Sequence, residues 1–262
     1  MILPKYNTKR DGVPILSHKK IDEDVLVLLE QYDKTLLTTP QALDIEDFVE
    51  RFMGYNIHFL DLTNNGSILG RMVFNKRKIL AYDAEHDDIT YCPVDEDTVV
   101  IDNSLLENEC LFRSTMGHEC GHGLYHKQIF KRDDNQISLF PEDEMVATVC
   151  RKVDIVGNAK GKRSLVTMHD WTEHHANYFS AALLMNKAAM NVLCGERGFR
   201  ERLKSEACGW ENEMLAEIVA DTFHVSKTSA KIRLAELGLD FKDYVPEPTI
   251  FTIGYPDAVP SY

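Results

Sequence analysis

The chain has 262 residues, 44% of them apolar, and a formal net charge of −13. This length allows a substantial core and is at the upper end of what one domain holds. The acidic excess argues against a protein whose main task is to neutralise nucleic-acid phosphates or to coat an anionic membrane. No apolar run reaches signal-peptide length at the N-terminus or the ~18 residues of a membrane span, so we expect a cytoplasmic protein without a membrane partner.

The six cysteines are scattered along the chain and include no CxxC pair. Such spacing indicates neither a disulfide framework nor a thiolate zinc knuckle. We therefore expect reduced, mostly buried thiols.

Apolar spacing in the first part of the chain predicts two helices, followed by short strands. The first helix is predicted to run from about 20 to 34, and the second from 44 to 53, where Gly54 ends it. Alternating, β-branched and aromatic residues then predict strands. The four predicted strands span 56–60, 69–74, 79–82 and 98–101.

The segment 83–97, between the third and fourth predicted strands, carries seven acidic residues and no Lys or Arg. These acids lack the spacing of a calcium-binding loop. We therefore interpret the segment as a solvated acidic loop, with a cation site as the alternative.

Helices are predicted to dominate the remainder of the chain. Ser104 and Glu107 have the spacing of a capping box at the start of a helix, and Thr167 and Asp170 repeat that pattern. The weak pattern over 133–166 predicts a long irregular segment between these helices. After Gly195 two or three further helices are expected.

These elements predict an α+β fold in which a small, mostly antiparallel sheet supports a central helix, with further helices around it. We expect a single domain over 1–244. It would comprise N-terminal helices at 20–54, the sheet and central helices at 55–194, and a C-terminal helical region at 195–244, followed by a tail at 245–262.

The central helix contains the motif HExxH, formed by His118, Glu119 and His122. Residues four apart share a helix face, so both imidazoles can reach one ion at the ~2.0 to 2.1 Å that zinc requires. Glu119 is rotated by about 100° from His118, which leaves its carboxylate beside the ion as a general base. The motif therefore predicts a zinc site, although His and Glu ligands also accept manganese or iron.

A catalytic zinc usually takes three protein ligands and keeps one position open. His126 is eight residues from His118, ~12 Å along the helix, so we reject it as a ligand. Glu173 and Asn177 share a face of the next helix, so one can bind zinc while the other orients an imidazole. We expect Glu173 to be the third ligand, with His174 and His175 as alternatives.

Three glycines lie in the motif helix, at positions 117, 121 and 123. Each costs about 1 kcal/mol relative to alanine in a helix interior. Close approach of a neighbouring helix, such as the one that bears Glu173, would explain them; loss of helix around Gly121 to Gly123 is the alternative.

Four segments together resemble the ImmA/IrrE family of metallo-endopeptidases. They are Thr98–Leu106, Arg113–His126, Asp170–Met185 and Phe223–Leu239. The resemblance implies a minimal zincin-like fold, Glu173 as the residue that completes the zinc site, and a cytoplasmic protease. It also implies a protein substrate, namely a helix-turn-helix repressor whose cleavage derepresses mobile-element or stress genes. The segment between His122 and Glu173 is longer than in compact members of that family, which puts inherited substrate recognition in doubt.

The expected reaction is therefore peptide-bond hydrolysis with Glu119 as the base. Tyr178, His126 and His175 are candidates for stabilising the transition state. Two other functions remain open. One is a non-catalytic metal-binding regulator; the other is a DNA-binding protein, because 214–237 has helix-turn-helix spacing. Six acids against three Lys or Arg in residues 211–240 make nucleic acid an unfavourable partner.

Overall fold

The computed structural model describes residues 6–130, 150–151, 165–207 and 209–241. It is a mixed α+β structure. The elements in chain order are α1 (His18–Tyr32), α2 (Thr35–Thr38), α3 (Ile45–Asp47), the π-helix η1 (Phe48–Phe52), β1 (Asn56–Leu60), β2 (Ile68–Val73), β3 (Arg77–Asp83), β4 (Asp88–Val94), β5 (Thr98–Asp102), the 3₁₀ helix η2 (Asn103–Glu107), α4 (Glu109–Phe130), β6 (Cys150–Arg151), α6 (Met168–Leu184), α7 (Lys187–Gly195), α8 (Arg197–Ala207), α9 (Glu211–Phe223) and α10 (Lys227–Glu236).

The main sheet has the strand order β1-β5-β2-β6, with β5 parallel to β1 and the other pairs antiparallel. Every residue of β5 is buried. Val99 and Ile101 point into the main core, whereas Val100 points into a second cluster on the other face with Ile79 and Val94 of the β3–β4 hairpin. The central strand is therefore covered on both sides, which explains why it is apolar throughout.

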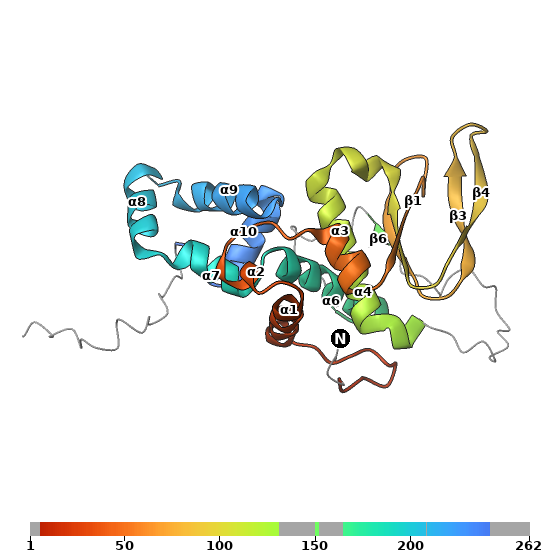
Figure 1. Cartoon of the computed structure of the whole chain (residues 1–262), viewed down its shortest axis with the longest axis horizontal. Helices are drawn as coiled ribbons and strands as arrows, with labels where there is room; N and C mark the ends of the chain where they lie inside the picture. The colour runs from red at the N-terminus through yellow and green to blue at the C-terminus, as the bar shows by residue number, and fades with distance from the viewer. Residues whose placement is uncertain (1–5, 131–149, 152–164, 208, 242–262) are drawn as a thin grey trace, which may run out of the picture.

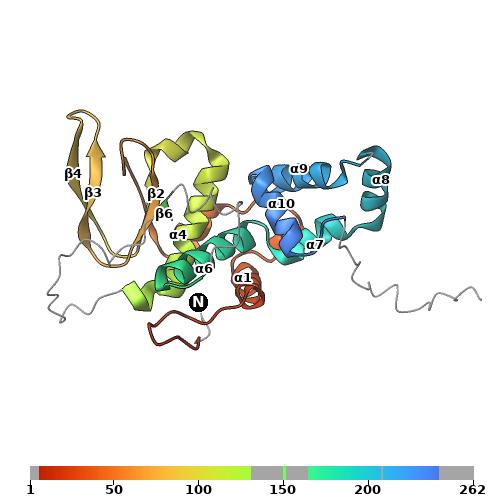
Figure 2. The same cartoon turned by 180° about the vertical axis from the view of Figure 1, so that it is seen from behind.

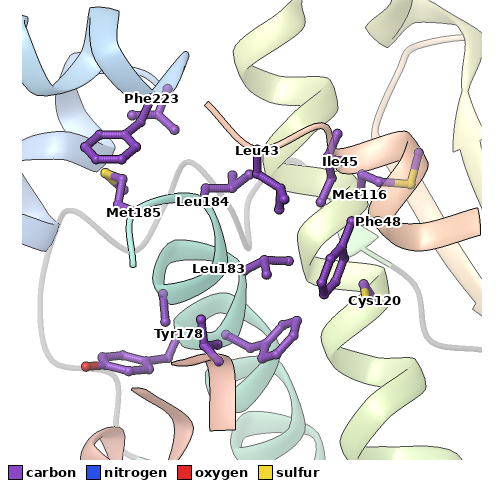
Figure 3. Close-up of a cluster of buried hydrophobic side chains, with 14 of the residues drawn as sticks. Leu43, Ile45, Phe48, Met116, Cys120, Tyr178, Leu183, Leu184, Met185 and Phe223 are labelled. Atoms are coloured by element: carbon purple, nitrogen blue, oxygen red, sulfur yellow. The ribbon is translucent and has the colours of Figure 1, made fainter. Parts of the chain in front are cut away.

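Helices α4 and α6 form the centre of the molecule (Figure 1). Both views show the β3–β4 hairpin beyond the sheet at one end, and α7 to α10 at the other (Figures 1 and 2). Figure 3 shows Met116 and Cys120 of α4 beside Phe48 and Leu183, in the main hydrophobic core. One side of α4 is thus occupied by core packing. No helix within the described ranges is both long and apolar enough to cross a membrane.

The structure confirms most of the predicted elements in the first half of the chain. Strands β1, β2, β3 and β5 lie within one or two residues of their predicted bounds, and α1 occupies the first predicted helix. The second predicted helix is instead one turn of α-helix followed by a π-helix. The capping box at Thr167 is also confirmed, because its hydroxyl accepts from the Asp170 amide and the Asp170 carboxylate accepts in return.

Two predictions in this part of the chain are wrong. The segment 83–97 is not a loop, since 88–94 forms β4, which pairs with β3. The strand was hidden because its exposed residues, Ile89 and Tyr91 among them, do not show a buried apolar face. The capping box at Ser104 is also absent.

Asp102 takes the capping role instead of Ser104. Its buried carboxylate accepts hydrogen bonds from the Leu62 amide at 2.7 Å and the Ser104 amide at 3.0 Å, and α4 begins only at Glu109. A buried carboxylate requires such donors, so it outcompetes a neighbouring hydroxyl. Of the predicted irregular segment 133–166, only 150–151 and 165–166 are described; the rest of it and the predicted tail lie outside the described residues.

Candidate metal centre

The HExxH motif lies in the middle of α4, which is a continuous helix over 22 residues. His118, Glu119 and His122 are each 0% exposed. Polar groups this deeply buried are costly unless they are partnered or hold an ion. The buried side chains of the motif therefore need hydrogen-bond partners or an ion, and the neighbouring residues show which groups are available.

Glu173 of α6 joins the two histidines. The Nε2 atoms of His118 and His122 are 3.0 Å apart, and each lies 3.3 Å from a carboxylate oxygen of Glu173. Ligand atoms held 2.0 to 2.1 Å from one tetrahedral ion are separated by roughly 3.3 to 3.4 Å. The three side chains are thus arranged as a His₂Glu donor set that could hold one cation.

The opposite nitrogens of both rings are also partnered. Nδ1 of His118 donates to Oδ1 of Asn177 at 2.9 Å, because an amide oxygen can only accept. Nδ1 of His122 lies 3.0 Å from Nδ1 of His126. With Nδ1 protonated, the lone pair of each Nε2 is directed toward the carboxylate, which is the tautomer that a metal ligand needs.

These contacts agree with two sequence-based expectations. Asn177 orients an imidazole while Glu173, one helical turn before it, lies between the two rings. His126 does not reach the Nε2 pair and instead contacts His122 from behind. Its own Nε2 is buried and has no hydrogen-bond partner among the described residues.

Electrostatics favour a positive charge between the three side chains. Burial alone would raise the pKa of Glu173, but His122 and His118 outweigh this and hold that pKa below its usual value. Burial lowers the pKa of His122. His118 differs, because Cys150 and Glu173 outweigh the effect of burial and raise its pKa well above the usual range. The anionic carboxylate thus attracts a cation, which can be a proton on His118 or a metal ion.

Glu119 lies beside this set and is not part of it. Its carboxylate lies with a nitrogen of His118 and the sulfur of Cys150, the three atoms being within 4.8 Å of one another. This offset is the one that the helix geometry of HExxH predicts for a general base.

Cys150 was not found by sequence reasoning. It belongs to β6, it is 0% exposed, and it lies within the weakly patterned segment that was predicted to be irregular. The preceding run Met-Val-Ala-Thr-Val is rich in β-branched residues, which is a strand signal. That signal indicated a strand, but nothing local indicated contact with α4, which bears His118 and Glu119.

Tyr178 is removed from the candidates for transition-state stabilisation. Its hydroxyl donates to Asp22 at 3.0 Å and accepts from Arg233 at 3.0 Å, and its ring stacks on His18. Figure 3 shows this ring extending away from α4. Asp22 and Arg233 belong to α1 and α10, so Tyr178 connects helices and does not face the His₂Glu set.

The remaining histidines of α6 occupy three different environments. His174 faces α1, where its Nε2 lies 3.0 Å from that of His18. His175 is buried and stacks on His126, with ring centroids 5.8 Å apart; neither of its ring nitrogens has a hydrogen-bond partner within the part of the chain that the structure describes. His169 is half-exposed, with Nδ1 3.7 Å from Glu173. His174 and His175 were the predicted alternatives to Glu173. Neither of them lies beside the Nε2 atoms of His118 and His122.

The glycines of α4 mark close approaches, as predicted. A Cβ on Gly117 would lie 2.7 Å from Oγ of Ser180, and one on Gly121 would lie 3.0 Å from Cδ1 of Phe179, both on α6. Gly123 instead faces the Tyr55 ring, at 2.7 Å. Two of the three therefore let α6 approach closely enough to place Glu173 beside the histidines.

No protein-family model matches the sequence, and no curated protein shows significant similarity to it. The ImmA/IrrE family therefore remains a resemblance. The function has to be argued from the geometry of the site.

Proposed function

We propose that the protein is a zinc-dependent endopeptidase with a zincin-like fold, in which His118, His122 and Glu173 bind the ion. One observation carries this proposal. The Nε2 atoms of His118 and His122 lie 3.0 Å apart, and each lies 3.3 Å from an oxygen of Glu173. Zinc bound there would polarise a peptide carbonyl and acidify the water that it binds. Manganese or iron would suit the same donors.

The residues of the site divide several tasks among them in this reaction. Glu119 takes a proton from the attacking water and later delivers it to the leaving amine. Asn177 and His126 hold the two imidazoles in the tautomer with Nε2 unprotonated. His126 and His175 remain the candidates that could stabilise the developing oxyanion, because each has a buried ring nitrogen without a partner among the described residues.

The substrate proposed is a protein, and specifically a helix-turn-helix repressor in the cytoplasm, on the strength of the family resemblance alone. The DNA-binding alternative is not favoured by the described C-terminal helices. Lys227 and Lys231 of α10 pair with Glu217 and Glu213 of α9, and Arg233 is 0% exposed. These basic side chains are thus already engaged, and phosphate groups would have to compete with carboxylates.

The metal site is tested by elemental analysis of the purified full chain. We expect about one zinc per chain in the parent and in Glu201→Ala, which removes an exposed glutamate of α8, and a clear loss in Glu173→Ala. Equal zinc content in the parent and in Glu173→Ala would show that a residue other than Glu173 is the third ligand. A parent without metal after zinc is supplied would contradict the proposal and favour a non-catalytic interaction protein.

The reaction is tested separately with a helix-turn-helix repressor as substrate. We expect the zinc-loaded parent to cleave it, and Glu119→Gln to bind as much zinc without cleaving. A fully active Glu119→Gln would contradict the assignment of the base. Zinc binding without cleavage by the parent would favour the non-catalytic regulator.

A further inference from the structure

Cys150 lies on the face of the sheet that packs against α4, the helix that bears His118 and His122. It is paired with Gly70 of β2, and residues directly opposite each other in an antiparallel pair project from the same face of the sheet. A Cβ on Gly70 would lie 2.8 Å from Thr115 and 3.3 Å from Glu119, so that face packs on α4. The pairing therefore directs the fully buried thiol toward the HExxH motif.

The sulfur is close enough to take part in the chemistry of the site. It lies within 4.8 Å of ligand atoms of both His118 and Glu119. A second feature also points to an ion in this space. Oε2 of Glu173 is buried and aimed at Nε2 of His118 from 3.3 Å, yet it has no hydrogen-bond partner among the described residues.

We propose that Cys150 binds the ion as a fourth protein ligand, in the position that a catalytic zinc keeps open for water. This inference rests on the metal site proposed above. The sulfur lies on the side of Glu119, where the attacking water must be for Glu119 to act as its base. On binding, the Cys150 thiol would lose its proton, which leaves with the displaced water. The resulting thiolate would then close the site, because a tetrahedral ion with four protein ligands has no open position.

The consequence is two forms of one site. With Cys150 bound, the ion has two imidazoles, a carboxylate and a thiolate, a closed set typical of structural zinc. With Cys150 withdrawn, the remaining His₂Glu set is open and competent for hydrolysis. Thiolate is also softer than the other three donors, so the closed form favours zinc over manganese.

X-ray absorption at the zinc edge of the full-length parent protein tests this ligand without any substitution. We expect one sulfur at about 2.3 Å in addition to nitrogen and oxygen at about 2.0 to 2.1 Å. A shell that contains only nitrogen and oxygen would overturn the inference.

A variant series with cobalt in place of zinc identifies which cysteine supplies the sulfur. We expect a thiolate-to-cobalt charge-transfer band in the parent and in Cys92→Ser, a half-buried control on β4, and complete loss of this band in Cys150→Ser. Elemental analysis accompanies each spectrum. One cobalt per chain with no band in the parent, or with a band that survives Cys150→Ser, overturns the role of Cys150 and leaves the His₂Glu site intact. A parent that binds neither zinc nor cobalt overturns both proposals.

Discussion

Asn177 on α6 accepts a hydrogen bond from His118 on α4 at 2.9 Å, so the helix that provides Glu173 also fixes the orientation of an imidazole. Partners of this kind typically contribute 10- to 100-fold to metal affinity. We expect Asn177→Ala to weaken zinc binding by about that factor, measured by competition with a chelator. Asn177→Asp keeps the acceptor and should stay close to the parent. Equal losses in both variants would indicate general damage to α6.

Gly117 lies where α4 packs closely against α6. Alanine would place its Cβ 2.7 Å from Oγ and 3.3 Å from Cα of Ser180, so the helices would have to separate. We expect Gly117→Ala to lower the free energy of unfolding by about 1 to 3 kcal/mol. Gly198 of α8 is the matched control, since the nearest atom of a described residue to a Cβ there is 3.9 Å away.

Gly198→Ala should raise the free energy of unfolding by about 0.5 to 1 kcal/mol, because alanine is the better helix former. Chemical denaturation of the metal-free proteins measures both variants. A stabilising Gly117→Ala would contradict the close approach of the helices.

Arg233 is a buried cation held by groups from two other helices. Its guanidinium donates to Asp22 at 2.5 Å, to the Tyr178 hydroxyl at 3.0 Å and to the Met185 carbonyl at 3.2 Å. Removing one partner of a buried pair leaves the other charge uncompensated. We expect Arg233→Met to cost about 3 to 5 kcal/mol in the free energy of unfolding.

The control for this variant is Arg197→Met, which removes an exposed ion pair with Glu201. Exposed pairs contribute between about 0 and 1 kcal/mol. A change in Arg233→Met as small as that in Arg197→Met would show that Asp22 is solvated without its partner.

His175 predicts a dependence of stability on acid pH. Burial, reinforced by His174 and Lys9, lowers its pKa from 6.5 to about 4. Above pH 6.5 the ring is neutral in both the folded and unfolded states. Between pH 6.5 and 4 the unfolded state gains a proton that the folded state does not, so stability falls as pH falls. The loss can reach about 3 kcal/mol.

His175→Phe should remove this part of the pH dependence. We expect the difference in unfolding free energy between this variant and the parent to change by about 3 kcal/mol from pH 7 to pH 4. Both proteins are measured without metal, so that metal loss does not contribute. Parallel pH profiles would show that protons reach His175 in the folded state.

The candidate site was predictable where it depends on one helix or on two strongly periodic ones. His118 and His122 follow from the 3.6-residue repeat, and Glu173 and Asn177 follow from the same repeat in α6. The close approach of α4 and α6 was also visible in the sequence, because glycine is unfavourable in a helix interior and its presence there indicates close packing. The sequence contained no comparable signal for the contacts that the short strand β6 makes.

Cys150 illustrates what could not be predicted. Its position depends on the pairing of a two-residue strand with β2, and so short a strand has too few residues to show a period. Tyr178, one of the three candidates for stabilising the transition state, faces away from the site for a related reason. It is next to Asn177 in sequence, but a rotation of about 100° per residue directs it toward α1 and α10. The exposed β4 strand was missed because alternation is visible only where one face is buried.

The pairing of Asp22 with Arg233 joins residues 211 positions apart in the chain. Contacts of such long sequence separation form late, because most of the chain must be ordered first. During synthesis, α1, α4 and α6 leave the ribosome well before α10, and until then Asp22 and Tyr178 lack their cationic partner. A nascent chain would thus contain its HExxH motif before Arg233 of α10 can bind Asp22 of α1 and Tyr178 of α6. Under the proposed endopeptidase function, this order would delay activity until the polypeptide is nearly complete.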